Sequence, residues 1–557
     1  MAHEEILAAV DAGRLMDCVR AVCTGERLSN EPEAQAFDVL HKSLEDAGCR
    51  VTRESLPGYV STPEGASFEV GGEAYEVLTH PMTPSVEVLE APLAYVPVDA
   101  VGETAPADVS GRIVLTDGLA MEPVVRALED RGAAGVVFIT GEEIHNMIVS
   151  RVWGSPTPET LHDYVGIPVA SLSFGDGTRL RARLAEAGGT LPARLSTRVE
   201  NRWTEIPVIT AEIRGADEDF VMVTGHVDSW GLGALDNASG NACAVELARI
   251  LAPLASDMRR SVRFVLWSGH SHGRYAGSTA WCDAHFEELE RHCLLNVNAD
   301  CLGGRGATVM TESPAMASTR GLARTALREA AGVTDWRGCR FSRSCDQSFW
   351  GAGVPSIFSQ VSEQPPFEGA AADAFGKMFG SGRTGGFGAW WHTRTDTPDK
   401  LDPENLARDV RVFASVLAHA LFDERLPVDA AAEVLELRDE LKTWQEKAGD
   451  SLDLSEVLAR LDLLAEALEA TARSDDPKRF EKRSRRVLSE IIPLAYVEGS
   501  VYSHDEALRA PPVPMLRLID ELASLSEHER NAALVSLRRA VNRLKASTAR
   551  ALEAARA

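Results

Sequence analysis

Apolar, strand-like runs alternate with helical segments between residues 206 and 300, and this alternation constrains the fold more than any other feature. The runs VITAEI, FVMVTG, SVRFVLWS and LLNVNAD are separated by stretches that are long enough for helices at 237–254 and 278–289. Apolar strands joined by helices of this length form a mostly parallel sheet that is covered by helices on both faces. The sequence therefore predicts an α/β fold.

Polar motifs follow three of these predicted strands. GHVDS follows FVMVT, GHSHG follows SVRFVLW, and Asp300 ends LLNVNAD. The carboxyl ends of parallel strands meet at one edge of a sheet, and catalytic groups gather there. We therefore expect His226, His270 and Asp300 to belong to one site.

Four residues make a ligand set of nitrogen and oxygen atoms. His226 and Asp236 lie in GHVDSWGLGALDNASG, Asp300 ends a strand, and His392 lies in WWHTRTDTPDKLDP. Two imidazoles and two carboxylates suit zinc or a neighbouring divalent metal. Asp228 would then accept the other N–H of His226 and fix its tautomer. No CxxC pair offers a thiolate zinc site instead.

These segments resemble the co-catalytic di-zinc aminopeptidase family, which includes bacterial leucyl aminopeptidases, glutamate carboxypeptidase and the transferrin receptor. The family pattern is HxD, DNASG, a Glu-Glu pair, NxD and a late HTxxDT, and all but the Glu-Glu pair occur here in that order. The resemblance implies a divalent metal cofactor, zinc, as one or two ions. It further implies that Asp236 bridges two metals, that His226 and Asp300 complete one site, and that His392 binds the other ion.

The resemblance also implies an order of domains. Residues 1–90 and 200–424 would form a catalytic domain of the zinc-peptidase type. Residues 91–199, with DVSGRIVL followed by RGAAGVVFIT, are similar to the protease-associated domain that is inserted in the larger relatives. Residues 425–557 have leucine spacings typical of helices and resemble the helical dimerisation domain of the glutamate carboxypeptidase branch. A homo-oligomer is expected on this basis, although packing within one chain explains the leucines equally well.

The Glu-Glu pair of the family is missing from LWSGHSHGRYAGS, where His270 and Ser271 occupy its place. His270 could serve as the general base, because an imidazole titrates near neutral pH. Alternatively, His270 or His272 could bind the metal that Ser271 cannot hold firmly, or the second metal site could be empty or weak. Apart from that alternative, a histidine in a polar turn such as His272 is expected to be solvated or hydrogen-bonded, without a role in the chemistry. The loss of two negative charges would favour an anionic ligand such as a substrate carboxylate.

Two further residues are candidate substrate contacts. Asp346, in SRSCDQSFWGAGVPS, lies in the loop that lines the pocket in relatives, and Trp390 precedes the ligand His392. An aromatic residue at this place is as typical of packing as of substrate binding. The segment 362–388 is too long for a simple connection and predicts a lid or a pocket wall.

Charge and targeting signals narrow the range of partners. The chain has 57 basic and 83 acidic residues, and the formal net charge of −26 would repel a nucleic-acid backbone. The acidic N-terminus lacks the features of a signal peptide, and no apolar run approaches the roughly 20 residues that span a bilayer. The nine cysteines, an odd number, are typical of free thiols in a reducing compartment. We therefore expect a cytoplasmic protein without nucleic-acid or membrane partners.

The favoured hypothesis is a metallohydrolase that cleaves an amide bond in a small peptide or amino-acid conjugate, with His270 as the base. One alternative is a catalytically silent scaffold that associates through its helical tail. Another is a metal enzyme of altered reaction type, such as one catalysing aminolytic cyclisation. The scaffold has no chemical reason to keep all four ligand residues, so their presence argues against it.

Overall fold

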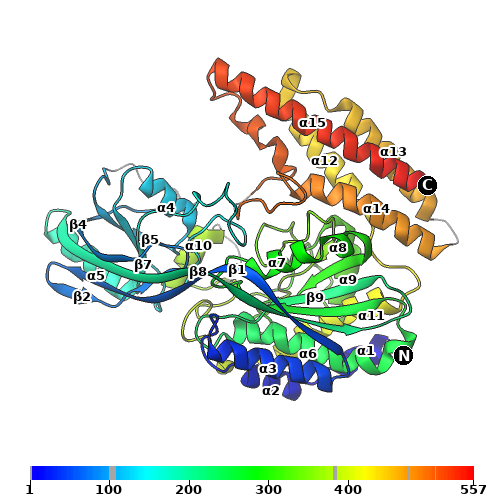
Figure 1. The fold of residues 1–557 in the computed structure, drawn as a ribbon, viewed down its shortest axis with the longest axis horizontal. Coiled ribbons are helices and arrows are strands. Elements are labelled where there is room, and N and C mark those ends of the chain that lie inside the picture. Colours follow the sequence, from blue (N-terminus) through cyan, green and yellow to red (C-terminus); the bar gives the residue numbers. More distant parts are fainter. Residues whose placement is uncertain (1–2, 99–107, 380–385, 473–475, 508–509) are drawn as a thin grey trace.

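The computed structural model describes residues 3–98, 108–379, 386–472, 476–507 and 510–557. Within these ranges the chain forms two lobes side by side, with a bundle of helices packed on one of them (Figure 1). We call the lobe that contains the N-terminal helices the main lobe, the other one the side lobe, and the described residues after 429, helices and connections together, the tail bundle or tail.

The main lobe is built on strands in the order β12-β11-β9-β10-β8. Strands β9 to β12 are parallel to one another, and only β8 is antiparallel to its neighbour β10. Almost every side chain of β9, β10 and β11 is buried, with Arg263 the single partly exposed residue. The structure therefore confirms the predicted sheet of mostly parallel strands covered on both faces. The strands are β8 (Leu191–Ile213), β9 (Phe220–His226), β10 (Ser261–Trp267), β11 (Cys293–Asn298) and β12 (Ser356–Ile357).

Helices cover both faces of this sheet. Helices α2, α3, α6 and α11 lie on one face, whereas α7 and α8 lie on the other (Figure 1). Helix α3 begins where the side chain of Asn30 accepts a hydrogen bond from the amide of Glu33, and it ends just before Gly48, which has a φ of +97°. The helices are α1 (His3–Ala8), α2 (Ala12–Val22), α3 (Glu31–Asp46), α6 (Ser239–Leu251), α7 (Ala276–Ala284), α8 (Phe286–His292), α9 (Arg320–Ala331) and α11 (Pro403–Phe422).

Two long antiparallel strands join the main lobe to the side lobe. Strand β1 (Arg50–Val70) pairs with β8 along its whole length, with one irregularity between Pro63 and Gly65. The sequence CRVTRESL predicts a strand at 49–56, and that strand is only the first part of a much longer one. Because both strands run through the two lobes without a break, the lobes share one continuous ribbon of backbone hydrogen bonds.

The side lobe continues the sheet in the order β8-β4-β5-β6-β7-β3. The expected domain boundaries at residues 91 and 199 lie inside β4 and β8. The chain passes between the lobes within β1 and β8 rather than through linkers, and residue 91 lies within the side lobe. The remaining elements are β2 (Glu73–Tyr75), β3 (Leu78–Thr79), β4 (Val86–Tyr95), β5 (Ile113–Asp117), β6 (Gly135–Ile139), β7 (Val169–Leu172), α4 (Glu122–Glu129) and α5 (Phe174–Glu186).

The tail bundle consists of four long helices. They are α12 (Ala430–Ala448), α13 (Ser455–Ala472), α14 (Pro477–Tyr496) and α15 (Glu527–Arg556). The bundle is fixed to the main lobe by Arg260, whose Nε lies 3.0 Å from both carboxylate oxygens of Glu481. Many of its leucines are fully buried inside the single chain, namely Leu437, Leu441, Leu461, Leu464, Leu537 and Leu544.

The segment 362–388, expected to be a lid or pocket wall, contains helix α10 (Ala370–Phe379), and its residues 380–385 lie outside the described part of the chain. The amides of Ala370 and Ala371 donate to the carboxylate of Glu142 over 3.0 and 3.3 Å. Since Glu142 belongs to the side lobe, α10 rests against that lobe.

One hydrophobic core runs from α2 and α3 through the sheet of the main lobe and into the tail bundle. Within the described ranges, no helix combines the length and the apolar character that crossing a membrane requires. All nine cysteines are free thiols.

Candidate metal centre

Three neighbouring parallel strands place polar residues at one edge of the main-lobe sheet. His226 is the last residue of β9, His270 follows β10, and Asp300 follows β11. Their exposed fractions are 0%, 9% and 6%, so the three side chains lie in an interior site. The parallel strands thus bring together the residues that the motifs predicted.

The carboxylate of Asp236 lies between two imidazoles. Its Oδ1 is 3.0 Å from Nε2 of His226, and its Oδ2 is 3.1 Å from Nε2 of His392. Oδ1 of Asp300 lies 3.7 Å from the same nitrogen of His226. The four expected ligand residues therefore meet, with Asp236 in the central position that suits a bridging carboxylate.

Backbone contacts fix the position of Asp236. The amides of Leu235 and Asp236 donate to the two oxygens of the Asp396 carboxylate over 2.9 and 3.0 Å. The side chain of Asn237 donates to the carbonyl of Ala299 and accepts a bond from the amide of Gly240. A Cβ at Gly240 would lie 2.2 Å from that same carbonyl oxygen, so only glycine fits there.

The unpaired atoms of the site fit a divalent cation. Nε2 of His226 and Oδ1 of Asp300 are buried and make no hydrogen bond of good geometry. Ligand atoms of His226, His270 and Asp300 all lie within 4.8 Å of one another, as do those of Asp236, Asp300 and Cys301. Buried lone pairs without a donor are costly, and a divalent metal would satisfy nitrogen and carboxylate ligands together.

The electrostatics of the site also favour a cation. Burial alone would lower the pKa of His226, but the nearby carboxylates of Asp236 and Asp300 raise it well above its usual value. Burial alone would raise the pKa of Asp236, but the nearby imidazoles of His226 and His392 lower it well below its usual value. Carboxylates and imidazoles this close to one another each favour the charged form of the other.

His270 has a fixed orientation. Its Nδ1 lies 2.6 Å from Oδ2 of Asp346, and its backbone amide donates to the carboxylate of Asp228 over 3.2 Å. Its ring stacks on His226 with the ring centres 3.8 Å apart and the planes 11° apart, and Tyr275 packs against its edge. Because Nδ1 is occupied by Asp346, Nε2 is the ring nitrogen left for chemistry.

Asp228 organises the turn in which His270 lies. Its carboxylate accepts hydrogen bonds from the amides of His270 and Ser271, and Nδ1 of His272 lies 2.9 Å from it. The bond expected from His226 to this carboxylate is made to the backbone carbonyl of Asp228 instead, over 2.9 Å, and the carboxylate lies 3.7 Å away. Asp228 therefore fixes the tautomer of His226 through its main chain, which leaves its side chain free to hold the turn.

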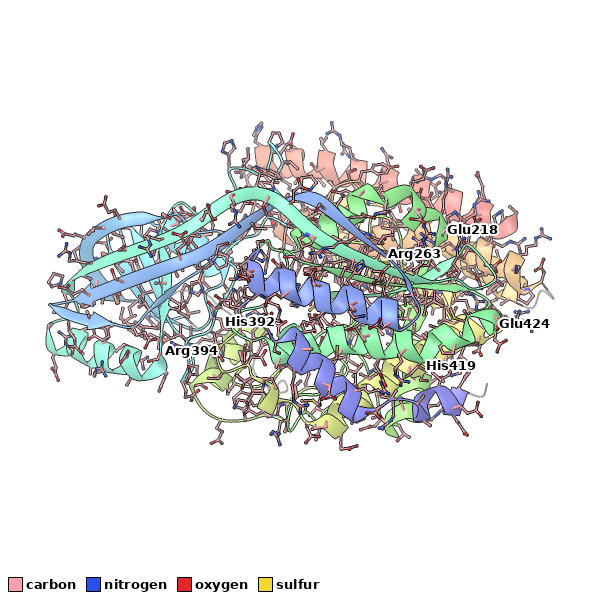
Figure 2. The ribbon with its side chains drawn as sticks, turned by 60° about the horizontal axis from the view of Figure 1, so that its bottom comes forward. Glu218, Arg263, His392, Arg394, His419 and Glu424 are labelled. Carbon is pink, nitrogen blue, oxygen red and sulfur yellow. The ribbon has the colours of Figure 1, made fainter. Side chains whose placement is uncertain are left out.

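His392 lies where the two lobes meet (Figure 2). Its Nδ1 is 2.9 Å from the carbonyl oxygen of Asn146, which belongs to the side lobe. Trp230 packs edge-on against its ring, with the ring centres 4.4 Å apart. The side lobe thus orients one of the two expected ligand histidines, and no motif in the sequence predicted this contact.

The two candidate substrate contacts have different surroundings. Asp346 is 1% exposed and its carboxylate faces His270, so its contact in this structure is with the residue in the base position. The indole N–H of Trp390 is buried without a hydrogen-bond partner. Substrate contact by either residue stays a prediction. Asp396 belongs to the late HTxxDT motif, but the motif alone does not predict that its carboxylate holds the backbone amides of Leu235 and Asp236.

The His272 contacts predict a pH-dependent stability of the metal-free protein. Burial alone would lower the pKa of His272, but the hydrogen bond and charge of Asp228 raise it above its usual value. A histidine whose pKa is raised on folding contributes stability that is full below about pH 6.5 and is lost as the pH rises through the folded pKa. His272→Gln should therefore destabilise the protein more at pH 6 than at pH 9.

Urea unfolding in the presence of a chelator, compared with wild type at each pH, measures this difference. His528→Gln is the matched control, because His528 is exposed on α15. A stability difference that does not change between pH 6 and pH 9 would contradict the prediction.

Comparisons with known proteins agree with the motifs. Residues 208–417 match the model of peptidase family M28. Aminopeptidase YwaD of Bacillus subtilis is 24% identical over 359 residues, which are 61% of this chain and 72% of that protein. A glutamate carboxypeptidase 2 homolog of Caenorhabditis elegans is 27% identical over 177 residues, 30% of this chain, and the match spans only 21% of that protein.

Solved structures agree with the fold. The aminopeptidase from Aneurinibacillus sp. strain AM-1 superposes with a TM-score of 0.54 and 20% identity, covering 75% of this chain and 96% of that one. A peptidase M28 precursor from Shewanella amazonensis has a TM-score of 0.57 and 21% identity, with 74% and 94% covered. The predicted resemblance to the co-catalytic zinc aminopeptidases is therefore confirmed, and the segment that matches peptidase family M28, residues 208–417, contains all four expected ligand residues.

Proposed function

We propose that this chain is a metal-dependent hydrolase of aminopeptidase type, which cleaves an amide bond in a small peptide or amino-acid conjugate. The observation that carries the proposal is the carboxylate of Asp236 between His226 and His392, with the unpaired oxygen of Asp300 beside them. These four residues would hold the metal. A bound divalent ion such as zinc would supply Lewis-acid polarisation of a carbonyl and a lowered pKa of water.

We propose His270 as the general base rather than as a metal ligand. An imidazole binds a metal in the plane of its ring. The rings of His226 and His270 are nearly parallel and stacked 3.8 Å apart, so their planes do not converge on one ion. His270 is instead suited to accept a proton at Nε2 from an attacking water, while Asp346 at Nδ1 stabilises the imidazolium that forms.

The two halves of the metal centre are unequally supplied with ligands. His226, Asp236 and Asp300 serve one side, whereas the side of His392 shares Asp236 and has Ser271 where the family has a carboxylate. In the described part of the chain, no cluster of three ligand atoms includes His392. We therefore propose one firmly bound ion near His226 and a weaker second one near His392.

An anionic substrate is supported by Arg274. Its Nε is buried without a hydrogen-bond partner, and its guanidinium lies 5.3 Å from the ring centre of Tyr275, which contacts His270. No carboxylate among the described residues pairs with it. A half-buried guanidinium in this place would bind a substrate carboxylate well.

Removal of the bridging carboxylate should abolish metal binding. Asp236→Asn is expected to reduce the bound metal to a small fraction of one ion per chain and to remove activity with it, because both imidazoles lose their shared partner. Elemental analysis of the purified variant measures the metal. Glu218→Gln, a change of an exposed acid on the main lobe, should leave it unchanged. Full metal occupancy in Asp236→Asn would reject the assignment.

Replacement of His270 separates a base from a ligand. His270→Ala should keep the metal content and lower turnover by about 10²- to 10⁴-fold, the range for loss of a general base. Turnover and metal are measured on the same preparation, with His528→Ala as the matched control.

Two other outcomes would decide against the base. If His270 binds the metal, His270→Ala loses an ion and the addition of Ser271→Glu restores it. If neither metal content nor turnover changes, His270 takes no part in the reaction.

We also propose that the chain self-associates through the tail bundle. Leu463 on α13 and Val535 on α15 are 46% and 44% exposed, and these two helices pack side by side. Light scattering at micromolar concentration should give twice the chain mass of 60.1 kDa, and Leu463→Lys should lower it. A wild-type protein that remains monomeric would contradict this proposal.

A further inference from the structure

The loop that carries Asp346 is held by the tail bundle at both of its ends. At one end, the guanidinium of Arg340 donates to the carbonyl of Ala495 over 2.6 Å and to the carboxylate of Glu440 over 2.6 Å. At the other end, a Cβ on Gly351 would lie 2.1 Å from the carbonyl oxygen of Val501, so the backbones touch. The tail thus borders the loop directly.

Further contacts follow the same pattern. Both terminal nitrogens of Arg485, on α14, donate to the carbonyls of Ala352 and Gly353, each over 3.0 Å. Arg485 is buried, so these bonds are shielded from water.

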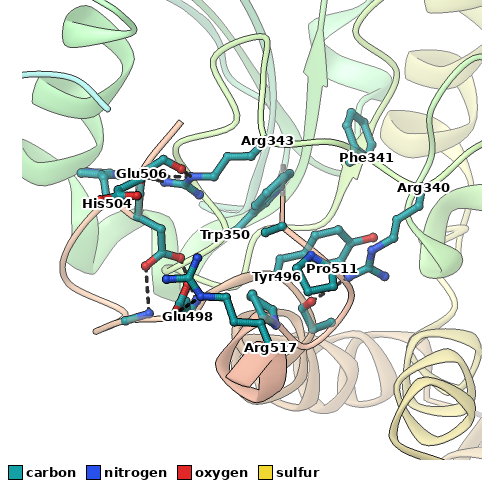
Figure 3. Close-up of a pocket in the computed structure, with 15 residues that line it drawn as sticks. Arg340, Phe341, Arg343, Trp350, Tyr496, Glu498, His504, Glu506, Pro511 and Arg517 are labelled. Carbon is teal, nitrogen blue, oxygen red and sulfur yellow. Dashed lines mark hydrogen bonds and ion pairs between the residues drawn. The ribbon is translucent and has the colours of Figure 1, made fainter. Parts of the chain in front are cut away.

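Arg343 ties the middle of the loop to the tail. Its Nε donates to the carbonyls of Asp505 and Glu506 over 3.0 Å, and a terminal nitrogen donates to Asp505 over 2.8 Å. Burial lowers its pKa to about 10, and in the described ranges no carboxylate forms an ion pair with it. Figure 3 shows Arg343 and Trp350 of the loop next to Glu506 of the tail, at a cavity of about 330 Å³. A half-buried guanidinium bound to carbonyl oxygens holds two stretches of backbone together.

A continuous series of side chains leads from Arg343 to the metal centre. Its guanidinium lies 4.4 Å from the ring centre of Trp153, which lies 4.0 Å from that of Tyr275. The Tyr275 ring in turn lies 4.9 Å from that of His270. The indole N–H of Trp153 also donates to Ser348, so the loop is held on its inner side as well.

The backbone of the loop needs this support. Cys345 and Asp346 both have a φ of 54°, the left-handed region that residues other than glycine rarely adopt. Such a conformation persists only where the surroundings enforce it. A loop released from Arg343 would relax, and the Asp346 carboxylate would leave Nδ1 of His270.

We propose that Arg343 is a positioning residue, through which the tail bundle holds Asp346 against His270 and so completes the active site within one chain. This inference rests on the proposed role of His270. The tail is then part of the catalytic machinery and not only a surface for association. Arg343 itself touches neither metal nor substrate.

The test compares Arg343→Met and Arg343→Lys with wild type in hydrolysis of leucine p-nitroanilide by the metal-loaded, full-length protein. Arg343→Met should lower kcat about tenfold or more, since small displacements of catalytic groups cost up to about a hundredfold. KM and metal content should stay unchanged. Arg343→Lys should recover part of kcat, because an ammonium can donate to the same carbonyls. Arg517→Met, at the other side of the cavity, is the matched control and should keep the wild-type kcat.

A double-mutant cycle identifies the path. If Arg343 acts through Asp346, then Arg343→Met should cause no further loss of kcat in an Asp346→Asn background. Independent of activity, amide hydrogen exchange of residues 342–348 should be faster in Arg343→Met than in wild type or Arg517→Met.

Several results would overturn the inference. These are unchanged exchange in 342–348, a loss that adds fully to that of Asp346→Asn, or a change in KM alone. If His270→Ala keeps full turnover while exchange in 342–348 still responds to Arg343→Met, the proposed base is wrong and the link between tail and loop stands.

Discussion

A buried carboxylate without compensation would be too costly to keep, and the arrangement of this molecule around Asp236 meets that constraint. The two compensating imidazoles come from different parts of the chain: His226 ends β9, and His392 follows the segment of α10. Asp396 then holds the backbone of residues 235 and 236 from a third direction. The proposed metal centre therefore forms only after several parts of the chain have folded together. These parts are the strand ends, the segment after α10 and the side lobe that orients His392.

The turn after β10 has His270 and Ser271 in place of the family's Glu-Glu pair, and Asp228 holds this turn in position. In this chain the carboxylate of Asp228 receives the amides of His270 and Ser271 and the ring of His272. Three donors on one carboxylate hold the turn firmly. Burial alone would raise the pKa of Asp228, but the hydrogen bond and charge of His272, together with the charges of His226 and His270, lower it below its usual value. His226 needs only the carbonyl of the same residue. Asp228 therefore orients His226, a proposed metal ligand, through its main chain and His270, the proposed base, through its side chain.

The sequence was sufficient for those parts of the fold that are encoded locally. Apolar runs predict buried strands. A polar residue directly after such a run lies at the edge of the sheet, so the site of His226 and Asp300 could be predicted. Contacts between residues that are far apart in the chain have no comparable signal in the sequence. His270 and Asp346 are 76 residues apart, and His392 and the carbonyl of Asn146 are 246 apart. Neither pair follows from any periodicity, and a backbone carbonyl has no sequence signature at all.

Strand β1 was predicted too short for a related reason. Pro57, Gly58, Pro63 and Gly65 are residues that usually end strands, yet the strand continues through all four because β8 pairs with it throughout. A Cβ at Gly58 would lie 2.0 Å from the side chain of Ile206, so the small residue permits close packing instead of breaking the strand. Pairing over more than a hundred residues of separation overrode the local preference.

The leucine spacing of the tail likewise predicts secondary structure but not the surface against which the helices pack. The spacing predicts helices, and α12 to α15 are helical, but the spacing alone does not say which surface they cover. In the structure Leu461, Leu464, Leu537 and Leu544 pack inside the chain. The contacts that distinguish this tail from a simple bundle are polar: Arg340 and Arg343 of the main lobe reach tail carbonyls. Burial of hydrophobic side chains drives the tail to pack against the main lobe. The directional hydrogen bonds determine the position in which it packs, and these bonds come from the loop that carries Asp346.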